Sequence, residues 1–168
     1  MTAPDHSEPP VFKLHHGFEV YPMPMFTAME TADVNAVAQW YRAALGFGVM
    51  FKAPEINGQP MVVHLRRRKY QDVLIRPVAP ERSLGVTDGL ELCFQAGEEV
   101  DQIAARAAAA PAIGKVRIEP PVDMPWNTRQ VRILDPDGRV LVFSHPRFDP
   151  DATERMRRMF EADEGGAR

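Results

Sequence analysis

The most informative segment of the sequence reads Gln39-Trp40-Tyr41-Arg42-Ala43-Ala44-Leu45-Gly46-Phe47. It ends a run of residues at the i, i+3, i+4 spacing of an amphipathic helix, namely Val34, Val37, Ala38, Tyr41 and Leu45. Asp33 before the run is a typical N-cap, and Gly46 after it suits the left-handed C′ position. The β-compatible residues 23–29 and 47–51 flank this helix, so the segment predicts a strand–helix–strand unit.

This order of elements occurs twice along the chain. The first copy continues through the hairpin signal Asn57-Gly58 into strands at residues 61–66 and 71–77. The second copy, offset by roughly 65 residues, has a helix that begins near Val100 and is stopped by Pro111. Its strands are expected at residues 89–95, 116–119, 129–134 and 139–144. The sequence therefore predicts an α+β fold of two tandem βαβββ modules.

The chain of 168 residues suits a single domain. The expected boundaries are an N-terminal arm at 1–21, a domain at 22–146 with modules at about 22–78 and 88–146, and a C-terminal helix and tail at 147–168. In the C-terminal segment, Met156, Met159 and Phe160 share one helical face. This face docks either on the chain's own domain or on a partner subunit.

The composition is that of an ordinary globular protein, with 45% hydrophobic and 26% charged residues. The net charge of −3 argues against nucleic acid as a partner, because phosphate binding requires an excess of Lys and Arg. The run Arg66-Arg67-Arg68-Lys69 is interpreted as a solvated hairpin end, with an anion site as the alternative. The only cysteine, Cys93, lies in an apolar segment and is expected to be buried. Since no bilayer-spanning run or signal-peptide pattern is found, we expect a cytoplasmic protein without a membrane partner.

Two motifs together resemble the vicinal oxygen chelate superfamily, which includes glyoxalase I, extradiol dioxygenases, fosfomycin-resistance enzymes and bleomycin-resistance proteins. The motifs are residues 39–47 and, near the other end of the domain, the turn Asp135-Pro136-Asp137-Gly138 before an apolar strand. The resemblance covers about residues 22–146. It implies a curled mixed sheet around a central cavity with the helices outside, and in metal-using members a divalent ion held by side chains from the first and last strands of each module.

In that alignment the four metal positions fall on Phe26, Leu74, Glu91 and Val142. Only Glu91 carries a donor atom, whereas ions such as Mg²⁺, Fe²⁺ or Zn²⁺ need about two or three converging protein ligands. We therefore expect no metal and no cofactor. The positions near Leu74 and Glu91 depend on the strand register, and a shift of one residue would make Asp72 a neighbour of Glu91.

Strand parity and the resemblance together predict the cavity lining, because alternate residues of a strand face opposite sides of a sheet. The predicted lining comprises Phe26, Ala28, Phe51, His64, Asp72, Leu74, Arg76, Glu91, Cys93, Trp126, Val140, Val142 and Ser144. The alternate residues are uniformly apolar and are expected to pack under the helices; they are Val73, Ile75, Leu92, Phe94, Leu141 and Phe143. Arg76 either contacts a ligand or forms an internal ion pair with one carboxylate. Trp126, before a strand, either stacks on a planar ligand at the cavity mouth or is a core or dimer-contact residue, whereas Trp40 is assigned to packing.

Three functions are compatible with these residues. The first is a metal-free binding protein for a small hydrophobic or aromatic molecule, similar to bleomycin-resistance proteins, which bind a drug in a groove at a homodimer interface. The second is a glyoxalase-superfamily lyase, isomerase or dioxygenase with a non-standard site, in which Glu91 acts as a general base assisted by His64. The third is an interaction domain whose cavity is filled by Phe26, Phe51 and Trp126. The apolar residues at three of the four metal positions favour the first function, and with it a homodimer.

Overall fold

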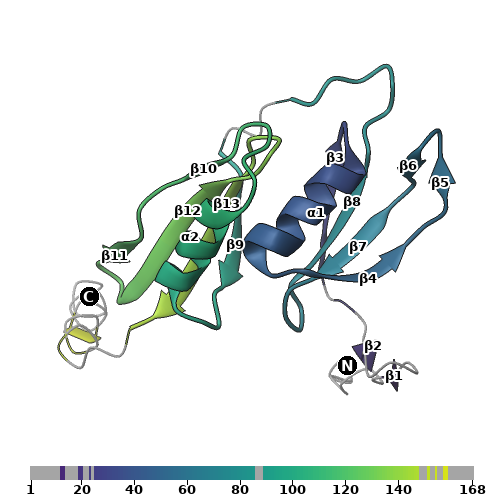
Figure 1. Cartoon of the computed structure of the whole chain (residues 1–168). Coiled ribbons are helices and arrows are strands. Elements are labelled where there is room, and N and C mark those ends of the chain that lie inside the picture. The colour runs from purple at the N-terminus through teal and green to yellow at the C-terminus, as the bar shows by residue number, and fades with distance from the viewer. Residues whose placement is uncertain are drawn as a thin grey trace, which may run out of the picture.

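The computed structural model describes residues 12–13, 19–20, 23, 25–85, 89–147, 151, 154 and 157–158 (Figure 1). Its helices are α1 (Val34–Leu45) and α2 (Val100–Ala109). The strands of the first half are β1 (Phe12–Lys13), β2 (Glu19–Val20), β3 (Thr27–Thr31), β4 (Gly48–Lys52), β5 (Glu55–Ile56), β6 (Gln59–Pro60), β7 (Val63–Arg66) and β8 (Asp72–Pro77). The strands of the second half are β9 (Glu91–Gln95), β10 (Arg117–Ile118), β11 (Val122–Met124), β12 (Thr128–Leu134) and β13 (Val140–Pro146).

The first module forms a four-stranded sheet in the order β3-β8-β7-β4. β3 and β8 run parallel, with Ala28 opposite Leu74, and the other pairs are antiparallel. One face of this sheet is covered by α1, which contacts β3, β7 and β8. The small β5–β6 hairpin turns through Asn57 and Gly58 at φ 54° and 78°, in the left-handed region that Asn and Gly tolerate. The Asn-Gly hairpin signal is thus confirmed.

The second module repeats this arrangement. Its sheet has the order β10-β12-β13-β9, and β11 adds to it by pairing with β12. β13 and β9 run parallel, with Val142 opposite Cys93, as β3 and β8 do in the first module. One face is covered by α2, which contacts β10, β12 and β13. The α+β class and the two tandem modules predicted from the sequence are therefore confirmed.

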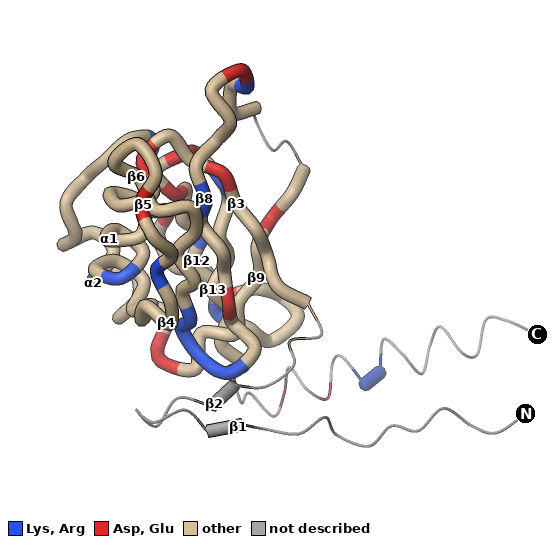
Figure 2. Tube along the Cα trace, turned by 90° about the vertical axis from the view of Figure 1, so that its right-hand side faces the viewer, with Lys and Arg blue, Asp and Glu red and all other residues tan. Residues whose placement is uncertain are grey.

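The two helices lie together on one side of the molecule and pack against each other. In Figure 2 both lie to the left of strands β3, β13 and β9. The α1 helix begins where Asp33 Oδ1 accepts the Ala36 N–H at 2.9 Å and ends at Gly46 with φ 75°, as its sequence predicts. Buried side chains from both helices and both sheets form one hydrophobic core, and Trp40, 3% exposed, belongs to it.

Each sheet has a second face, which no described helix covers. Along β9, Glu91 and Cys93 are exposed on this face, while Leu92 and Phe94 turn toward the core. Within the described strands no pairing joins the two sheets, so they form two open sheets beside the shared helices. We call the uncovered sides the open face of the first sheet and the open face of the second sheet. Any site built on the predicted cavity residues must lie there.

Two sequence expectations are wrong. Cys93 is exposed and not buried, because it points to the open face although its neighbours in the sequence are apolar. The basic run is only partly solvated: Arg68 and Lys69 are exposed, but the Arg67 side chain is 3% exposed and donates hydrogen bonds to the carbonyl oxygens of Leu45 and Ala96. Arg67 therefore joins the two modules.

The two ends of the chain are described only in part. The described residues of the predicted C-terminal helix, Asp151, Glu154, Arg157 and Arg158, are helical. Its apolar residues Met156, Met159 and Phe160 lie outside the described residues, as does most of the predicted N-terminal arm, so the domain boundaries stay predictions. In the part of the chain that is described, no helix is long and apolar enough to cross a membrane. The cytoplasmic location stays a prediction.

Candidate functional site

The structure places the predicted lining residues on the two open faces. The alternate set lies under the helices: Val73, Ile75, Leu141 and Phe143 are buried, and Leu92 and Phe94 pack partly against the same core. The open face of the first sheet carries Ala28, Phe51, His64, Asp72, Leu74 and Arg76, with the exposed Phe26 just before β3. The open face of the second sheet carries Glu91, Cys93, Val140, Val142 and Ser144. The strand residues predicted to face the helices therefore do so. Within one chain, however, the predicted lining residues divide between two sheets.

A pocket of about 360 Å³ lies on the open face of the second sheet. We call it the second-sheet pocket, and its lining is Glu91, Glu119, Pro120, Val122, Met124, Trp126, Gln130, Arg132 and Val142. Three of these residues, Glu91, Trp126 and Val142, belong to the predicted lining. Trp126 is 50% exposed and therefore is not a core residue of the single chain.

The Trp126 ring is carried by the hairpin between β11 and β12. Asn127 turns this hairpin with φ 66° and donates its N–H to the Met124 carbonyl oxygen at 3.1 Å. Arg129 anchors the hairpin through hydrogen bonds of 2.7 Å to Asp123 and to Asp101 at the start of α2. Hydrogen bonds from Arg129 lower the pKa of both carboxyl groups, so the anchor stays ionised at neutral pH. The tryptophan is thus presented by a fixed turn.

Charged side chains on the pocket wall pair with one another. The Arg132 guanidinium forms an ion pair with Glu91 and lies 3.5 Å from Glu119. All three side chains are about 40% exposed, so these pairs contribute little to stability. They give the pocket a polar rim beside the apolar surface of Met124 and Val142. A site of this kind can orient an apolar ligand by a few polar contacts.

A second group of polar side chains lies on the open face of the first sheet. The Asp72 side chain is 1% exposed, and its carboxylate contacts His64 Nε2 at 2.6 Å and accepts hydrogen bonds from Arg66 Nε at 2.8 and 3.1 Å. The pairing of β7 with β8 sets this contact, because Arg66 lies opposite Asp72. Asp72 therefore pairs with His64 and Arg66.

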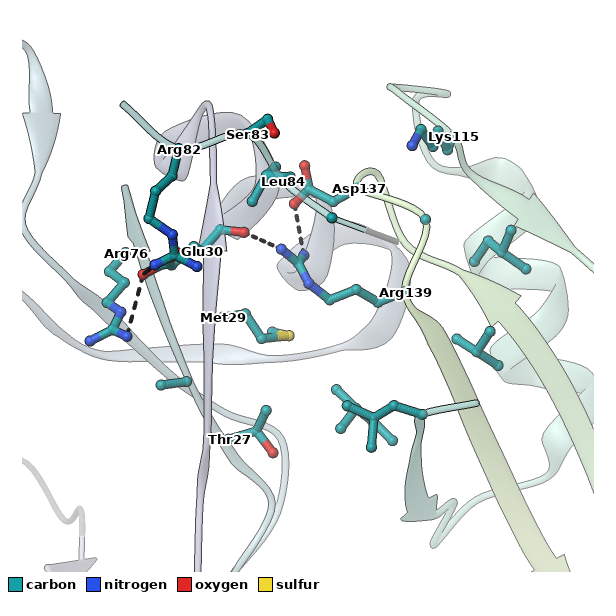
Figure 3. A pocket seen from close by; sticks show the side chains of 17 residues that line it. Thr27, Met29, Glu30, Arg76, Arg82, Ser83, Leu84, Lys115, Asp137 and Arg139 are labelled. Atoms are coloured by element: carbon teal, nitrogen blue, oxygen red, sulfur yellow. Dashed lines mark hydrogen bonds and ion pairs between the residues drawn. The ribbon is translucent and has the colours of Figure 1, made fainter. Parts of the chain in front are cut away.

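A larger cleft of about 610 Å³ lies between the modules, where the edge strand β3 faces the start of β13 (Figure 3). We call it the inter-module cleft. Its lining includes Ala28, Arg76 and Val140 from the predicted set, together with residues 82–85 and Leu90 of the connection between the modules. Arg76 forms an ion pair with Glu30 at 3.4 Å, but its side chain is 54% exposed, so this is not the internal pair that the sequence suggested.

Eight of the thirteen predicted lining residues fall into three groups: the second-sheet pocket, the His64–Asp72 pair and the inter-module cleft. Phe26, Phe51, Leu74, Cys93 and Ser144 line neither of the two hollows described above. Sequence reasoning missed Gln130 and Arg132, although residues 130–134 alternate between buried and more exposed positions. The same parity argument, extended to β12, would have found them. Glu119 ends a predicted strand, whereas Val122 and Met124 lie on the short strand β11, which the sequence did not predict.

The sequence matches the Glyoxalase/Bleomycin resistance protein/Dioxygenase superfamily over residues 26–143. The chain belongs to this superfamily. The match includes both modules and both motifs from which the resemblance was inferred. No curated protein matches the sequence.

Several solved structures are similar in fold. TioX from Micromonospora sp. ML1 is 21% identical, with a TM-score of 0.56 over 74% of this chain and 97% of TioX. The bleomycin resistance determinant encoded on transposon Tn5 is 17% identical, with a TM-score of 0.55 over 73% of this chain and 96% of that protein. TnmS3, an antibiotic binding protein from Streptomyces sp. CB03234, is 22% identical, with a TM-score of 0.54 over 72% of this chain and 93% of TnmS3. Identities this low establish a shared fold and not a shared ligand.

The positions that hold a metal in other members of the superfamily do not fit one here. Leu74 belongs to the first sheet, Phe26 lies just before its strand β3, and Val142 belongs to the second sheet; none of them has a side-chain donor atom. Glu91 has one, but its carboxylate is paired with Arg132. Among the described residues no three His, Cys, Asp or Glu side chains are grouped so as to hold an ion. The described part of the chain therefore offers no donor set for chelate chemistry.

Proposed function

We propose that this chain is a metal-free binding protein for a small hydrophobic or aromatic molecule, and that it sequesters an antibiotic-like compound. The observation that carries the proposal is the second-sheet pocket, in which the half-exposed Trp126 ring lies with Met124 and Val142. An aromatic ring that stacks on a planar ligand contributes about 0.5–1.5 kcal/mol beyond the burial of apolar area. The shared fold of an antibiotic binding protein and a bleomycin resistance determinant supports this ligand class.

The ion pairs of Glu91 and His64 favour binding over catalysis. A general base must be able to take a proton from its substrate, whereas the Glu91 carboxylate is engaged by Arg132. His64, the proposed assistant of Glu91, lies on the other sheet and is bonded to Asp72. The second-sheet pocket therefore has orienting groups but no activated one.

We also propose that a second copy of the chain completes the site. The second-sheet pocket, at about 360 Å³, is near the lower end of the roughly 300–1,000 Å³ typical of ligand sites, so a further wall would deepen it. Phe26 and Phe51 are 53% and 55% exposed on the side of the first sheet that no helix covers. Covering one such ring contributes about 1.5–3 kcal/mol. A homodimer would bury them and supply that wall.

Isothermal titration calorimetry of chelator-treated protein tests the binding proposal. The probes are bleomycin and a panel of planar aromatic compounds, and mass spectrometry of the recovered probes detects any reaction. We expect saturable binding of at least one probe without added metal, and recovery of that probe unchanged. Trp126→Ala should weaken the binding about tenfold, which corresponds to about 1.4 kcal/mol.

The control variant is Tyr70→Asn. Tyr70 is 55% exposed and lies outside the second-sheet pocket, and its φ of 65° is one that Asn tolerates, so the variant removes an exposed ring without backbone strain. It should bind as the unaltered protein does. Saturable binding that requires a divalent ion, or a probe returned as a product, contradicts the proposal.

The alternative function is a lyase, isomerase or dioxygenase of the superfamily with a non-standard site. The observation in its favour is the 2.6 Å contact between His64 Nε2 and Asp72, since a carboxylate that orients a histidine is common in acid–base catalysis. Under this alternative, one of the probes is converted and His64→Gln abolishes the conversion. Under the binding proposal, His64→Gln leaves all probes unconverted, as does the unaltered chain.

A further inference from the structure

The inter-module cleft has an apolar floor and a basic rim. The floor includes Met29 from the first module and Leu90, Leu92 and Val140 from the second. Figure 3 shows Arg76 and Arg82 converging on the Glu30 carboxylate, and Arg139 of the second module bonded both to Asp137 and to the Glu30 carbonyl oxygen. The cleft is lined from both modules and from the connection between them, and it does not include Trp126 or Glu91 of the second-sheet pocket.

The rim has more positive than negative charge. Its basic residues are Arg76, Arg82, Lys115 and Arg139. The carboxylates that contact them are Glu30, Asp135 and Asp137. Four cations thus face three anions, although the whole chain has a net charge of −3. Among the described residues Lys115 forms no ion pair, and its chain carbons and nitrogen lie next to Gly138.

The Glu30 carboxylate cannot accept hydrogen bonds from all the N–H groups of Arg76 and Arg82, which share it. Its carboxylate lies 3.4 Å from Arg76 and 2.9 Å from Arg82, whose side chains are 54% and 62% exposed. Two guanidinium groups offer roughly ten N–H donors, whereas one carboxylate offers about four acceptor sites. Guanidinium N–H groups therefore remain at the rim that can bind a second carboxylate. The planar guanidinium group suits the geometry of a carboxylate.

We propose that the inter-module cleft binds a small organic monoanion, with its carboxylate at Arg76 and Arg82 and its apolar body on the leucine and valine floor. The excess of one positive charge matches a monoanion. The cleft volume of about 610 Å³ lies well within the range of roughly 300–1,000 Å³ that holds small ligands. This site is distinct from the proposed aromatic site, which lies on the open face of the second sheet.

Octanoate and 1-octanol test this proposal, because they differ in the carboxylate and share an apolar chain. Methyl NMR spectra of the labelled chain are recorded during titration with each probe. We expect octanoate to shift the methyl signals of Leu84, Leu90, Leu92 and Val140, and to bind at least about fivefold more tightly than 1-octanol. Raising the salt concentration toward 1 M should reduce this preference, since the two arginines are exposed to solvent.

The double variant Arg76→Gln/Arg82→Gln should abolish the preference for octanoate. Arg42→Gln is the matched control, because Arg42 is exposed on α1 outside the cleft, and it should keep the preference. Equal affinities for the two probes overturn the proposal, as does a preference that persists in the double variant. Shifts confined to Val122 and Val142 also overturn it, since they would place octanoate in the second-sheet pocket.

Discussion

Tyr41 and Asp135 explain why the two motifs of the sequence occur together. Both residues are buried, and the Tyr41 hydroxyl donates a hydrogen bond to Asp135 Oδ2 at 2.9 Å. The other oxygen of Asp135 accepts the N–H groups of Asp137 and Arg139, which closes the turn between β12 and β13. The helix motif of the first module thus binds the turn motif of the second. The pair positions the β13 end of the inter-module cleft.

Tyr41→Phe should lower the free energy of unfolding by about 1–3 kcal/mol, because it removes one donor from a buried carboxylate. Urea unfolding followed by circular dichroism measures the change. Tyr70→Phe, at an exposed tyrosine, is the control and should have little effect. An unfolding midpoint for Tyr41→Phe equal to that of the control would show that the hydrogen bond does not stabilise the contact between modules.

The same pair predicts how stability depends on alkaline pH. Burial, together with the charge of Asp135, raises the pKa of Tyr41 well above its ordinary value of 10.0. The folded chain therefore holds the phenol proton more tightly than the unfolded chain does. This stabilisation is complete below pH 10.0 and is lost as the pH rises toward the folded-state pKa. Urea midpoints between pH 8 and 11 should fall more steeply for the unaltered chain than for Tyr41→Phe, and parallel curves would contradict this.

At the scale of single residues, the sequence predicted well where strands alternate regularly. Val73, Ile75 and Phe143 were assigned to the core from strand parity and the resemblance, and the structure buries them. Cys93 was misassigned, because residue type suggested burial while parity placed it on the open face. The partners of charged residues could not be predicted, since the contacts of Arg76 with Glu30 and of Arg132 with Glu91 depend on how distant segments meet.

At the scale of elements, a cluster of arginines joins the loops at one end of the two modules. Arg67, from the β7–β8 turn, donates to the Ala96 carbonyl oxygen at 2.6 Å and to Glu98, just before α2. Arg106, from α2, donates to the Ala44 carbonyl oxygen at the end of α1 and also bonds Glu98. Hydrogen bonds from Arg106 help to keep the pKa of Glu98 below its ordinary value. This cluster and the Tyr41–Asp135 pair both fix the helices and sheets relative to each other.

Arg67→Ala should lower the free energy of unfolding by about 3 kcal/mol, since it leaves buried carbonyl groups without a donor and removes one partner of Glu98. Arg68→Ala changes the neighbouring residue, which is exposed and bonded to the Gly97 carbonyl oxygen, and should cost less than about 1 kcal/mol. Chemical unfolding of both variants measures the difference. Equal losses for the two variants would contradict a joining role for Arg67.

Most elements were predictable because their signals are local. The cap residues of α1, the Asn-Gly hairpin and the Asp-Pro-Asp-Gly turn each specify backbone geometry within a few residues. The strand β11 (Val122–Met124) was not predicted, since it is short and lies between prolines at 121 and 125. Its existence depends on pairing with β12, which is a tertiary contact. This missed strand forms the wall of the second-sheet pocket.

At the scale of the whole molecule, two open sheets lie beside a shared pair of helices. The sequence indicated the modules and the parity of their strands, but parity cannot specify whether the two sheets of one chain close around a cavity. Closure depends on how the two modules sit against each other, and the contacts of Arg67, Arg106 and Tyr41 link them. The proposed dimer is the means by which the open faces would be covered.

Size-exclusion chromatography with light scattering tests the dimer. We expect a mass of twice the 18.9 kDa of one chain for the unaltered protein. Phe26→Asp/Phe51→Asp should shift the mass toward that of one chain, because it places charges where the apolar contact is proposed. Ile56→Asp, at a residue of similar exposure on the β5–β6 hairpin, is the control and should remain dimeric. A single-chain mass for the unaltered protein would contradict the dimer.

The central claim is that the open face of the second sheet binds an apolar or aromatic molecule without a metal. Its most direct test is a methyl NMR spectrum of chelator-treated protein with the probe that calorimetry shows to bind most tightly. The account predicts that the methyl signals of Val122, Met124 and Val142 shift on saturation, while those of Val34 and Ile103 in the helical core do not. Unchanged signals from the second-sheet pocket on a saturated sample would contradict the claim.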